Sequence, residues 1–199
     1  ILSAKAEVFW LHERFGLAVM GLLGFRVCWG FMGGHYARFN QFLVSPKVAI
    51  ASMRRLFHTD DDPAAAGHSA HGGYAVLGLI VITGFMSFSG LFANDDVLFD
   101  GPLAHLLPWL SGAATNAHHI GEKLLFLMLF LHLTAILVYK FIKRRNLTMV
   151  MLKGRAVQKA GLAGPDGGIS VARCWTGLLL LVIFLAAAQS ISFLRPVLF

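Results

Sequence analysis

The chain alternates between long apolar stretches and shorter polar connections. Four stretches, at residues 8–32, 72–92, 117–142 and 174–193, consist mostly of apolar residues. A helix that crosses a bilayer needs about 20 consecutive, predominantly apolar residues, and each stretch reaches that length. The pattern therefore predicts an all-α fold, a polytopic membrane helical bundle with four transmembrane helices.

The connection between the first two stretches contains a shorter segment that mixes apolar and basic residues, K-V-A-I-A-S-M-R-R-L-F-H. Pro46 precedes it, at a position where a helix accepts proline because the first N–H groups lack intrahelical partners. We expect this segment to form a short amphipathic helix on the membrane surface.

A glycine-rich segment, A-G-L-A-G-P-D-G-G-I-S, separates the last stretch from the rest of the chain. Glycine and proline in such a run favour a flexible linker. We expect residues 1–155 to form the main membrane domain, residues 156–172 the linker, and residues 173–199 an additional C-terminal transmembrane helix. Because this last helix contains no histidine, we interpret it as a peripheral span or a docking helix.

Composition and charge support a membrane location. Hydrophobic residues make up 57% of the chain, and the net charge is +7 at pH 7. Lys and Arg gather after the first and third stretches, whereas the connection between the second and third contains three aspartates and no Lys or Arg. The positive-inside rule then places the two basic connections in the cytoplasm. The basic residues flank spans without an aromatic–basic motif, so no nucleic acid is expected as a partner.

The two cysteines, Cys28 and Cys174, lie in or beside spans, and the chain has no C-x-x-C-H motif. They suggest neither a disulfide framework nor a zinc site, and any haem would be bound non-covalently, as haem b. No charged region with a cleavage site precedes the first stretch, so no signal peptide is predicted.

The third stretch carries histidines at a spacing that aligns two of them. His118 and His132 are fourteen residues apart, which on a helix is about 21 Å along the axis and within roughly 40° of one face. His119 points about 140° away from His132. Ionisable residues at membrane depth are costly and indicate function. The aligned pair fits two metal centres stacked across the bilayer, each with an imidazole on iron; the alternative is two packing or interfacial histidines.

The first stretch repeats this spacing with His12 and Arg26, again fourteen residues apart. We call the level of His12 and His118 the outer level, and the level of Arg26 and His132 the inner level. An arginine inside a span needs an anionic partner, which a haem propionate at the inner level would supply. Alternatively, Arg26 extends its charged group to the membrane surface.

Small residues in the first stretch and histidines outside the spans each allow two interpretations. Gly16, Gly21 and Gly24 either permit close helix contact or admit a flat macrocycle. His68 and His71, three residues apart before the second span, share a helical face; we interpret them as an interfacial pair that contacts a propionate or quinone, with a zinc site as the alternative. The remaining histidines outside the spans are interpreted as surface residues: His35, His58 and His105.

Several motifs occur in an order that is typical of one family. They are L-H-E-R-F-G, F-R-V-C-W-G-F-M-G-G-H-Y-A-R-F, G-H-S-A-H-G-G, S-G-L-F-A-N-D-D-V-L-F-D-G-P-L, H-x13-H and R-R-N-L. Together they resemble the bacterial di-haem b-type cytochromes, the prokaryotic cytochrome b-561 and hydrogenase cytochrome-b subunit family, over roughly residues 9–155.

The resemblance implies a bundle with two haem b groups, each held by two axial histidines. His12 and His118 would hold the outer haem, and His132 would hold the inner one. In the family the fourth ligand lies on an earlier helix with an R-x-x-H-W-type motif, whereas this sequence opens at Ile1, just before the family's second span. We therefore expect the inner haem's second ligand upstream of Ile1 or on a partner chain. The alternatives are His71 as that ligand, or an empty inner site.

The resemblance also implies electron transfer through haem b in a bacterial inner membrane. The chain would pass electrons between a quinone pool and a redox partner of the respiratory chain, as a subunit of a larger complex rather than as an independent enzyme. Two alternatives are a stand-alone quinone-linked oxidoreductase of the superoxide oxidase type and a haem-free membrane scaffold.

Overall fold

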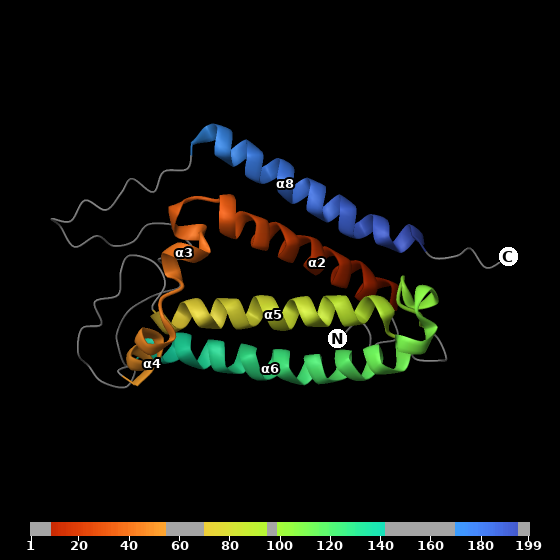
Figure 1. Ribbon diagram of the computed structural model, residues 1–199, viewed down its shortest axis with the longest axis horizontal. Coiled ribbons are helices and arrows are strands. Elements are labelled where there is room, and N and C mark those ends of the chain that lie inside the picture. Colours follow the sequence, from red (N-terminus) through yellow and green to blue (C-terminus); the bar gives the residue numbers. More distant parts are fainter. Residues whose placement is uncertain (1–8, 55–69, 95–98, 142–169, 195–199) are drawn as a thin grey trace.

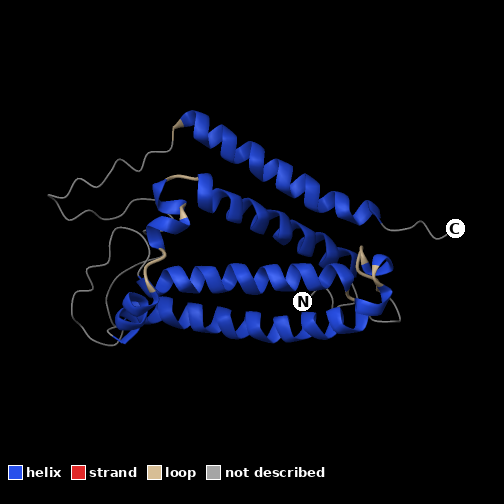
Figure 2. Ribbon diagram, in the orientation of Figure 1, coloured by secondary structure: helices blue, strands red, loops and turns tan. Residues whose placement is uncertain are grey.

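A computed structural model describes residues 9–54, 70–94, 99–141 and 170–194 of the chain. Within these ranges the chain is helical, and the one β-type contact is an isolated bridge between Asn94 and Asp100 (Figure 2). The long helices are α2 (Phe9–Met32), α5 (Ala70–Phe92), α6 (Ser111–Phe141) and α8 (Val171–Ser190). Each is long and apolar enough to cross a membrane, so the predicted all-α bundle with four spans is confirmed.

The four long helices follow one another across the bundle in the order α6, α5, α2 and α8. α5 packs against α6 and against α2, and α2 packs against α8 on its other side (Figure 1). α2 and α5 lie close at one end of the bundle and diverge toward the other (Figure 1). α8 is therefore the peripheral span that its lack of histidine indicated.

Short elements close the two ends of the bundle. At one end, η1 (His35–Ala37), α3 (Phe39–Phe42) and α4 (Pro46–Arg54) join α2 to α5. At the other end, η2 (Ala104–Leu106) and η3 (Pro108–Leu110) lead into α6, and η4 (Ile191–Leu194) follows α8. We call these the α4 end and the η2 end.

The predicted amphipathic helix is present as α4, and it begins at Pro46 as expected. Ala49 is buried, whereas the neighbouring Val48 and Ile50 are exposed. The connection is also tied to α5, because the hydroxyl of Tyr74 donates a hydrogen bond of 2.7 Å to the carbonyl of Val44. α4 therefore lies across the end of α5.

α6 begins six residues before the predicted third span, at Ser111 instead of residue 117. Its first two turns, S-G-A-A-T-N-A, are small and polar, so hydropathy alone does not include them. Alanine has the highest helix propensity, which allows the helix to extend beyond its apolar part. α8 likewise begins at Val171, within the expected linker, and most of that linker lies outside the described residues.

The glycines of α2 serve two different purposes. A Cβ at Gly21 would lie 2.9 Å from the backbone oxygen of Phe184, and one at Gly24 would lie 2.7 Å from its ring. These two glycines therefore permit the close approach of α2 and α8. A Cβ at Gly16 would have no atom within 4 Å. Helix contact, one of the two interpretations, therefore holds for Gly21 and Gly24. Gly16 faces open space, and whether it admits a macrocycle stays a prediction.

Candidate functional site

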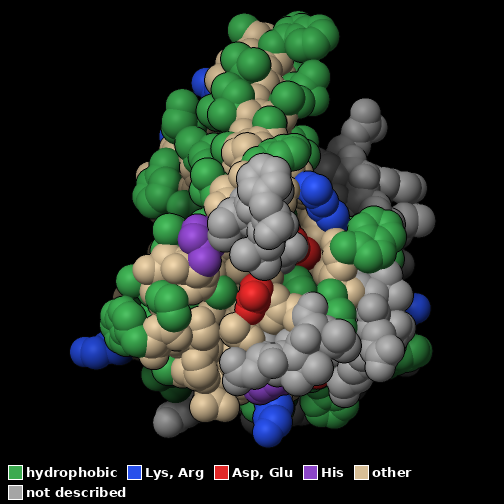
Figure 3. Space-filling model, turned by 90° about the vertical axis from the view of Figure 1, so that its right-hand side faces the viewer, with side chains coloured by type: hydrophobic (Ala, Val, Ile, Leu, Met, Phe, Trp, Pro, Cys, Tyr) green, Lys and Arg blue, Asp and Glu red, His purple; other side chains and the backbone are tan. Residues whose placement is uncertain are grey.

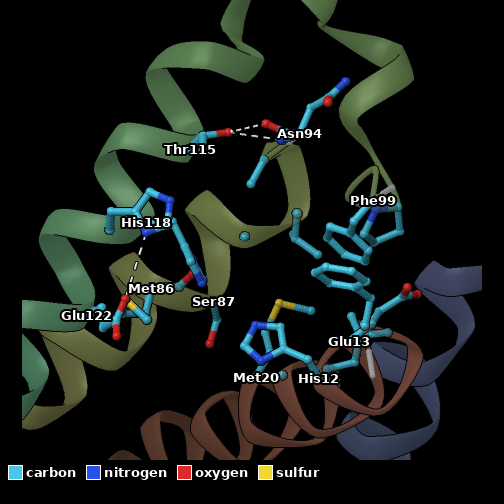
Figure 4. Close-up of a pocket in the computed structure, with 18 residues that line it drawn as sticks. His12, Glu13, Met20, Met86, Ser87, Asn94, Phe99, Thr115, His118 and Glu122 are labelled. Carbon is cyan, nitrogen blue, oxygen red and sulfur yellow. Dashed lines mark hydrogen bonds and ion pairs between the residues drawn. The ribbon is translucent and has the colours of Figure 1, made fainter. Parts of the chain in front are cut away.

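A cavity of about 340 Å³ lies between α2, α5 and α6 at the η2 end. Its volume is in the usual range for cofactor and ligand sites. His12, Gly16 and His118 all line it, and Figure 4 shows side chains from several helices directed into the same space. Three residues that the sequence analysis assigned to the outer level therefore line one hollow in the fold.

His12 and His118 face each other across this cavity. Their ring centroids are 6.0 Å apart, and the ring planes are nearly perpendicular, at 86°. A metal–imidazole bond is about 2 Å long, so two such bonds in line give ring centres roughly 6 Å apart. The pair therefore has the separation that two axial ligands of one iron require. His12 lies in the first turn of α2 and His118 in the third turn of α6, and each is partly buried.

The backbone of α5 fixes which nitrogen of His118 carries hydrogen. Nδ1 lies 3.0 Å from the carbonyl oxygen of Met86, which can only accept a hydrogen bond. Nδ1 must therefore be the protonated nitrogen, which leaves Nε2 with a lone pair for a metal. The hydroxyl of Ser89 lies 3.4 Å from the same Nδ1 and donates to the Met86 carbonyl at 3.1 Å. His118 is therefore held in the tautomer that a metal ligand needs.

Gly90 makes room for this ring. A Cβ at Gly90 would lie 3.0 Å from Cε1 and 3.2 Å from Nδ1 of His118, closer than ordinary van der Waals contact. The His118 imidazole therefore packs directly against the backbone of α5. Met86, Ser89 and Gly90 were not predicted as parts of the site, because the second span contains no ionisable residue after its start and was interpreted as packing alone.

Two carboxylates also line the cavity. Glu13 is buried, with 9% of its surface exposed, and Glu122 lies one turn after His118 on α6. Among the described residues that form the lining, none is Lys or Arg. Seen from the η2 end, acidic side chains lie near the middle of this face (Figure 3). Two carboxyl groups therefore lie beside the histidine pair.

His119, the neighbour of His118, has a different environment. Its side chain is 65% exposed, and its Nδ1 lies 3.8 Å from the Glu122 carboxylate. It belongs to the rim of the cavity, whereas His118 faces His12. In the described part of the chain, no three His, Cys, Asp or Glu side chains converge as a larger metal site. The cavity thus presents one facing pair of histidines.

The inner level is less complete. His132 is partly buried on α6. The Arg26 guanidinium donates to the carbonyl of Ala37 at 3.3 Å and lies over the rings of Phe39, at 5.1 Å, and Phe42, at 5.9 Å. The structure therefore brings Arg26 to the connection between α2 and α4.

The remaining histidines lie where no ligand role can be assigned from contacts. His71 falls in the first turn of α5, at the α4 end, and its side chain is outside the described part; His68 and His58 lie wholly outside the described residues. His105 is exposed in η2, as a surface residue would be, and His35 is partly buried in η1.

The family model of prokaryotic cytochrome b561 matches residues 2–154. The chain belongs to this family. The match includes α2, α5 and α6, and it ends before α8. Comparisons with curated proteins and with solved structures find no match. The protein is therefore a multi-pass membrane cytochrome b of electron transfer, in a family whose cofactor is haem b.

Proposed function

We propose that this cytochrome carries electrons across the bilayer through haem b, and that His12 and His118 are the axial ligands of the outer haem. The observation that carries this proposal is the facing pair of imidazoles, one of which is fixed by the Met86 carbonyl with its Nε2 unprotonated. Haem b, when bound, supplies an iron that alternates between the ferric and ferrous states.

The residues around the pair favour electron transfer over oxygen chemistry. With both imidazoles on its iron, haem b would have no position open for a substrate and would pass electrons without binding oxygen. Gly16 leaves open space where the face of a macrocycle can approach α2. Glu13 and Glu122 line the same cavity and would lie near the bound group.

At the inner level we propose a second haem with His132 as one axial ligand. It would lie about 21 Å along α6 from the outer ligand. Its second ligand is His71 or a histidine outside the described residues, on this chain or on a partner. Arg26 uses one of its five donors on Ala37. The others remain available for a propionate of this haem, and His68 and His71 are placed in sequence to contact a propionate or a quinone.

The electron partners follow from this arrangement. We propose that the protein exchanges electrons with a membrane quinone at one end and with a redox protein at the other, as a subunit of a complex in the bacterial inner membrane. The basic connections of the sequence would place the α4 end in the cytoplasm. The lining of the outer cavity contains two carboxylates and, among the described residues, no cation. The connection between the second and third spans contains no Lys or Arg that would attract superoxide, which argues against the superoxide oxidase alternative.

The proposal is tested with membrane vesicles that contain the protein. Added quinol should reduce the haem, as seen in the visible absorption bands, and the reduced-minus-oxidised spectrum should be that of low-spin haem b. In His12→Ala the outer-haem part of this spectrum should be lost. Vesicles whose protein shows no haem spectrum would support the haem-free scaffold. Haem that quinol does not reduce would contradict the quinone link.

A further inference from the structure

α8 is the part of this chain that lies beyond the cytochrome b561 match, which ends at residue 154. It packs along α2, which places α2 between α8 and α5 (Figure 1). α2 carries His12, so α8 supports the back of the helix that lines the outer cavity.

Close packing holds the two helices together along their length. At the middle of α2, Gly21 and Gly24 allow Phe184 of α8 to approach the backbone. Toward the α4 end, the Trp29 ring lies against Gly177, where a Cβ would be 2.8 Å from the ring. These contacts fix the separation of the helices. They lie at the middle of α2 and toward the α4 end, so they do not reach the first turn, which carries His12.

A polar clamp at the η2 end adds a restraint on the first turn of α2. The Arg14 guanidinium donates to the Gln189 side-chain oxygen at 3.2 Å and to the Ser192 hydroxyl at 3.0 Å. The Gln189 amide in turn donates to the backbone carbonyl of Arg14 at 3.0 Å. This last bond ties α8 directly to the backbone of α2, two residues from His12.

The first turns of α2 need such a restraint because one side of them faces a cavity. On that side, Leu17 packs in the small apolar cluster with Leu91, and the ring of Phe9 stacks on that of Phe99 at 5.5 Å. Between these two contacts lies His12, whose ring projects into the open space (Figure 4). The amides of a helix's first turn also lack intrahelical partners, so this turn is less constrained than the interior.

We propose that Gln189 is a positioning residue for the outer haem: through the Arg14 carbonyl it sets the rotation of the first turn of α2 and thereby the angle between the His12 and His118 rings. This inference rests on the proposed function. It assigns to α8 a role in tuning the haem, beyond that of an added membrane span. The angle between axial imidazole planes determines the g values of low-spin ferric haem and contributes to its potential.

The test compares Gln189→Leu, which removes both hydrogen bonds, with Ser192→Ala, which removes one acceptor from Arg14. Thr176→Ala is the matched control, since the Thr176 hydroxyl bonds only to the Ala172 carbonyl on α8 itself. The low-spin EPR signal and the midpoint potential of the outer haem are measured in the purified protein. Both should shift in Gln189→Leu, shift less in Ser192→Ala, and stay unchanged in Thr176→Ala.

Wild-type signals in Gln189→Leu and Ser192→Ala would overturn the proposal, as would an equal shift in Thr176→Ala. If Gln189→Leu does not fold, Gln189→Glu decides by the same criterion, because it keeps an oxygen for the Arg14 guanidinium and loses the amide that donates to the Arg14 carbonyl. A wild-type protein without haem would overturn the proposed function together with this inference. A wild-type low-spin signal that both variants retain would overturn the inference alone.

Discussion

Gly90→Ala offers a specific test of how α5 holds the outer site. The new methyl group would lie 3.0 Å from Cε1 and 3.2 Å from Nδ1 of His118, whereas carbon atoms prefer about 3.5–4.0 Å. The ring must therefore move by several tenths of an ångström. That movement lengthens its 3.0 Å hydrogen bond to the Met86 carbonyl, which holds the ligand tautomer.

The cost of this substitution can be worked out from these contacts. Overpacking by one methyl group costs about 1–3 kcal/mol, and the hydrogen bond contributes about 0.5–1.5 kcal/mol. The ring can relax toward the cavity, so we expect a net loss near the low end, about 1–2 kcal/mol of haem-binding free energy. This corresponds to a roughly 5–30-fold weaker affinity.

The assay is a haem titration of the haem-depleted protein, followed by Soret absorbance, for Gly90→Ala beside the wild type. Gly112→Ala is the control, because a Cβ at Gly112 meets no atom within 4 Å on the same end of the bundle. An affinity for Gly90→Ala equal to that of the wild type would refute this role of α5 in the site. An equal loss in Gly112→Ala would do the same.

Three further predictions concern the two levels. Ser89→Ala removes a hydroxyl that lies 3.4 Å from Nδ1 of His118. We expect this variant to retain haem and to show a shifted midpoint potential of the outer haem in a redox titration. An unchanged potential would count against a role for this hydroxyl. Gly16→Leu fills the open space in front of α2. The haem content should therefore fall, while the circular dichroism spectrum stays that of a helical protein. Full haem content would show that the haem macrocycle does not approach this glycine. Arg26→Leu should shift the potential of the inner haem at His132 more than that of the outer haem, and equal shifts would argue against a propionate partner at Arg26.

The membrane spans could be predicted because a bilayer imposes a length on every apolar stretch that crosses it. The second span was placed at residues 72–92, and α5 ends at Phe92. The start of α6 could not be found in this way, since its first turns are helical without being apolar. Helix propensity and the preceding Pro108 are the signals that would have placed it.

The facing histidines were also within reach of the sequence. Helical spacing separated His118 from His119, and the structure places His118 opposite His12 with His119 at the rim. The groups that orient His118 were not predictable, because a backbone carbonyl such as that of Met86 has no signal in residue identity. The roles of Gly90 and of the clamp at Gln189 likewise depend on which helices become neighbours. The pattern of membrane spans along the sequence does not determine this.

Haem content in variants of two adjacent histidines tests the outer site most directly. Haem per chain is measured as the pyridine haemochrome in purified wild type, His118→Ala and His119→Ala. We expect His118→Ala to lose one haem per chain, because its imidazole faces His12 at 6.0 Å. His119→Ala should retain the wild-type content, since its side chain is 65% exposed and lies at the rim, 3.8 Å from the Glu122 carboxylate. Full haem content in His118→Ala, or a loss in His119→Ala instead, would contradict the assignment of the outer site.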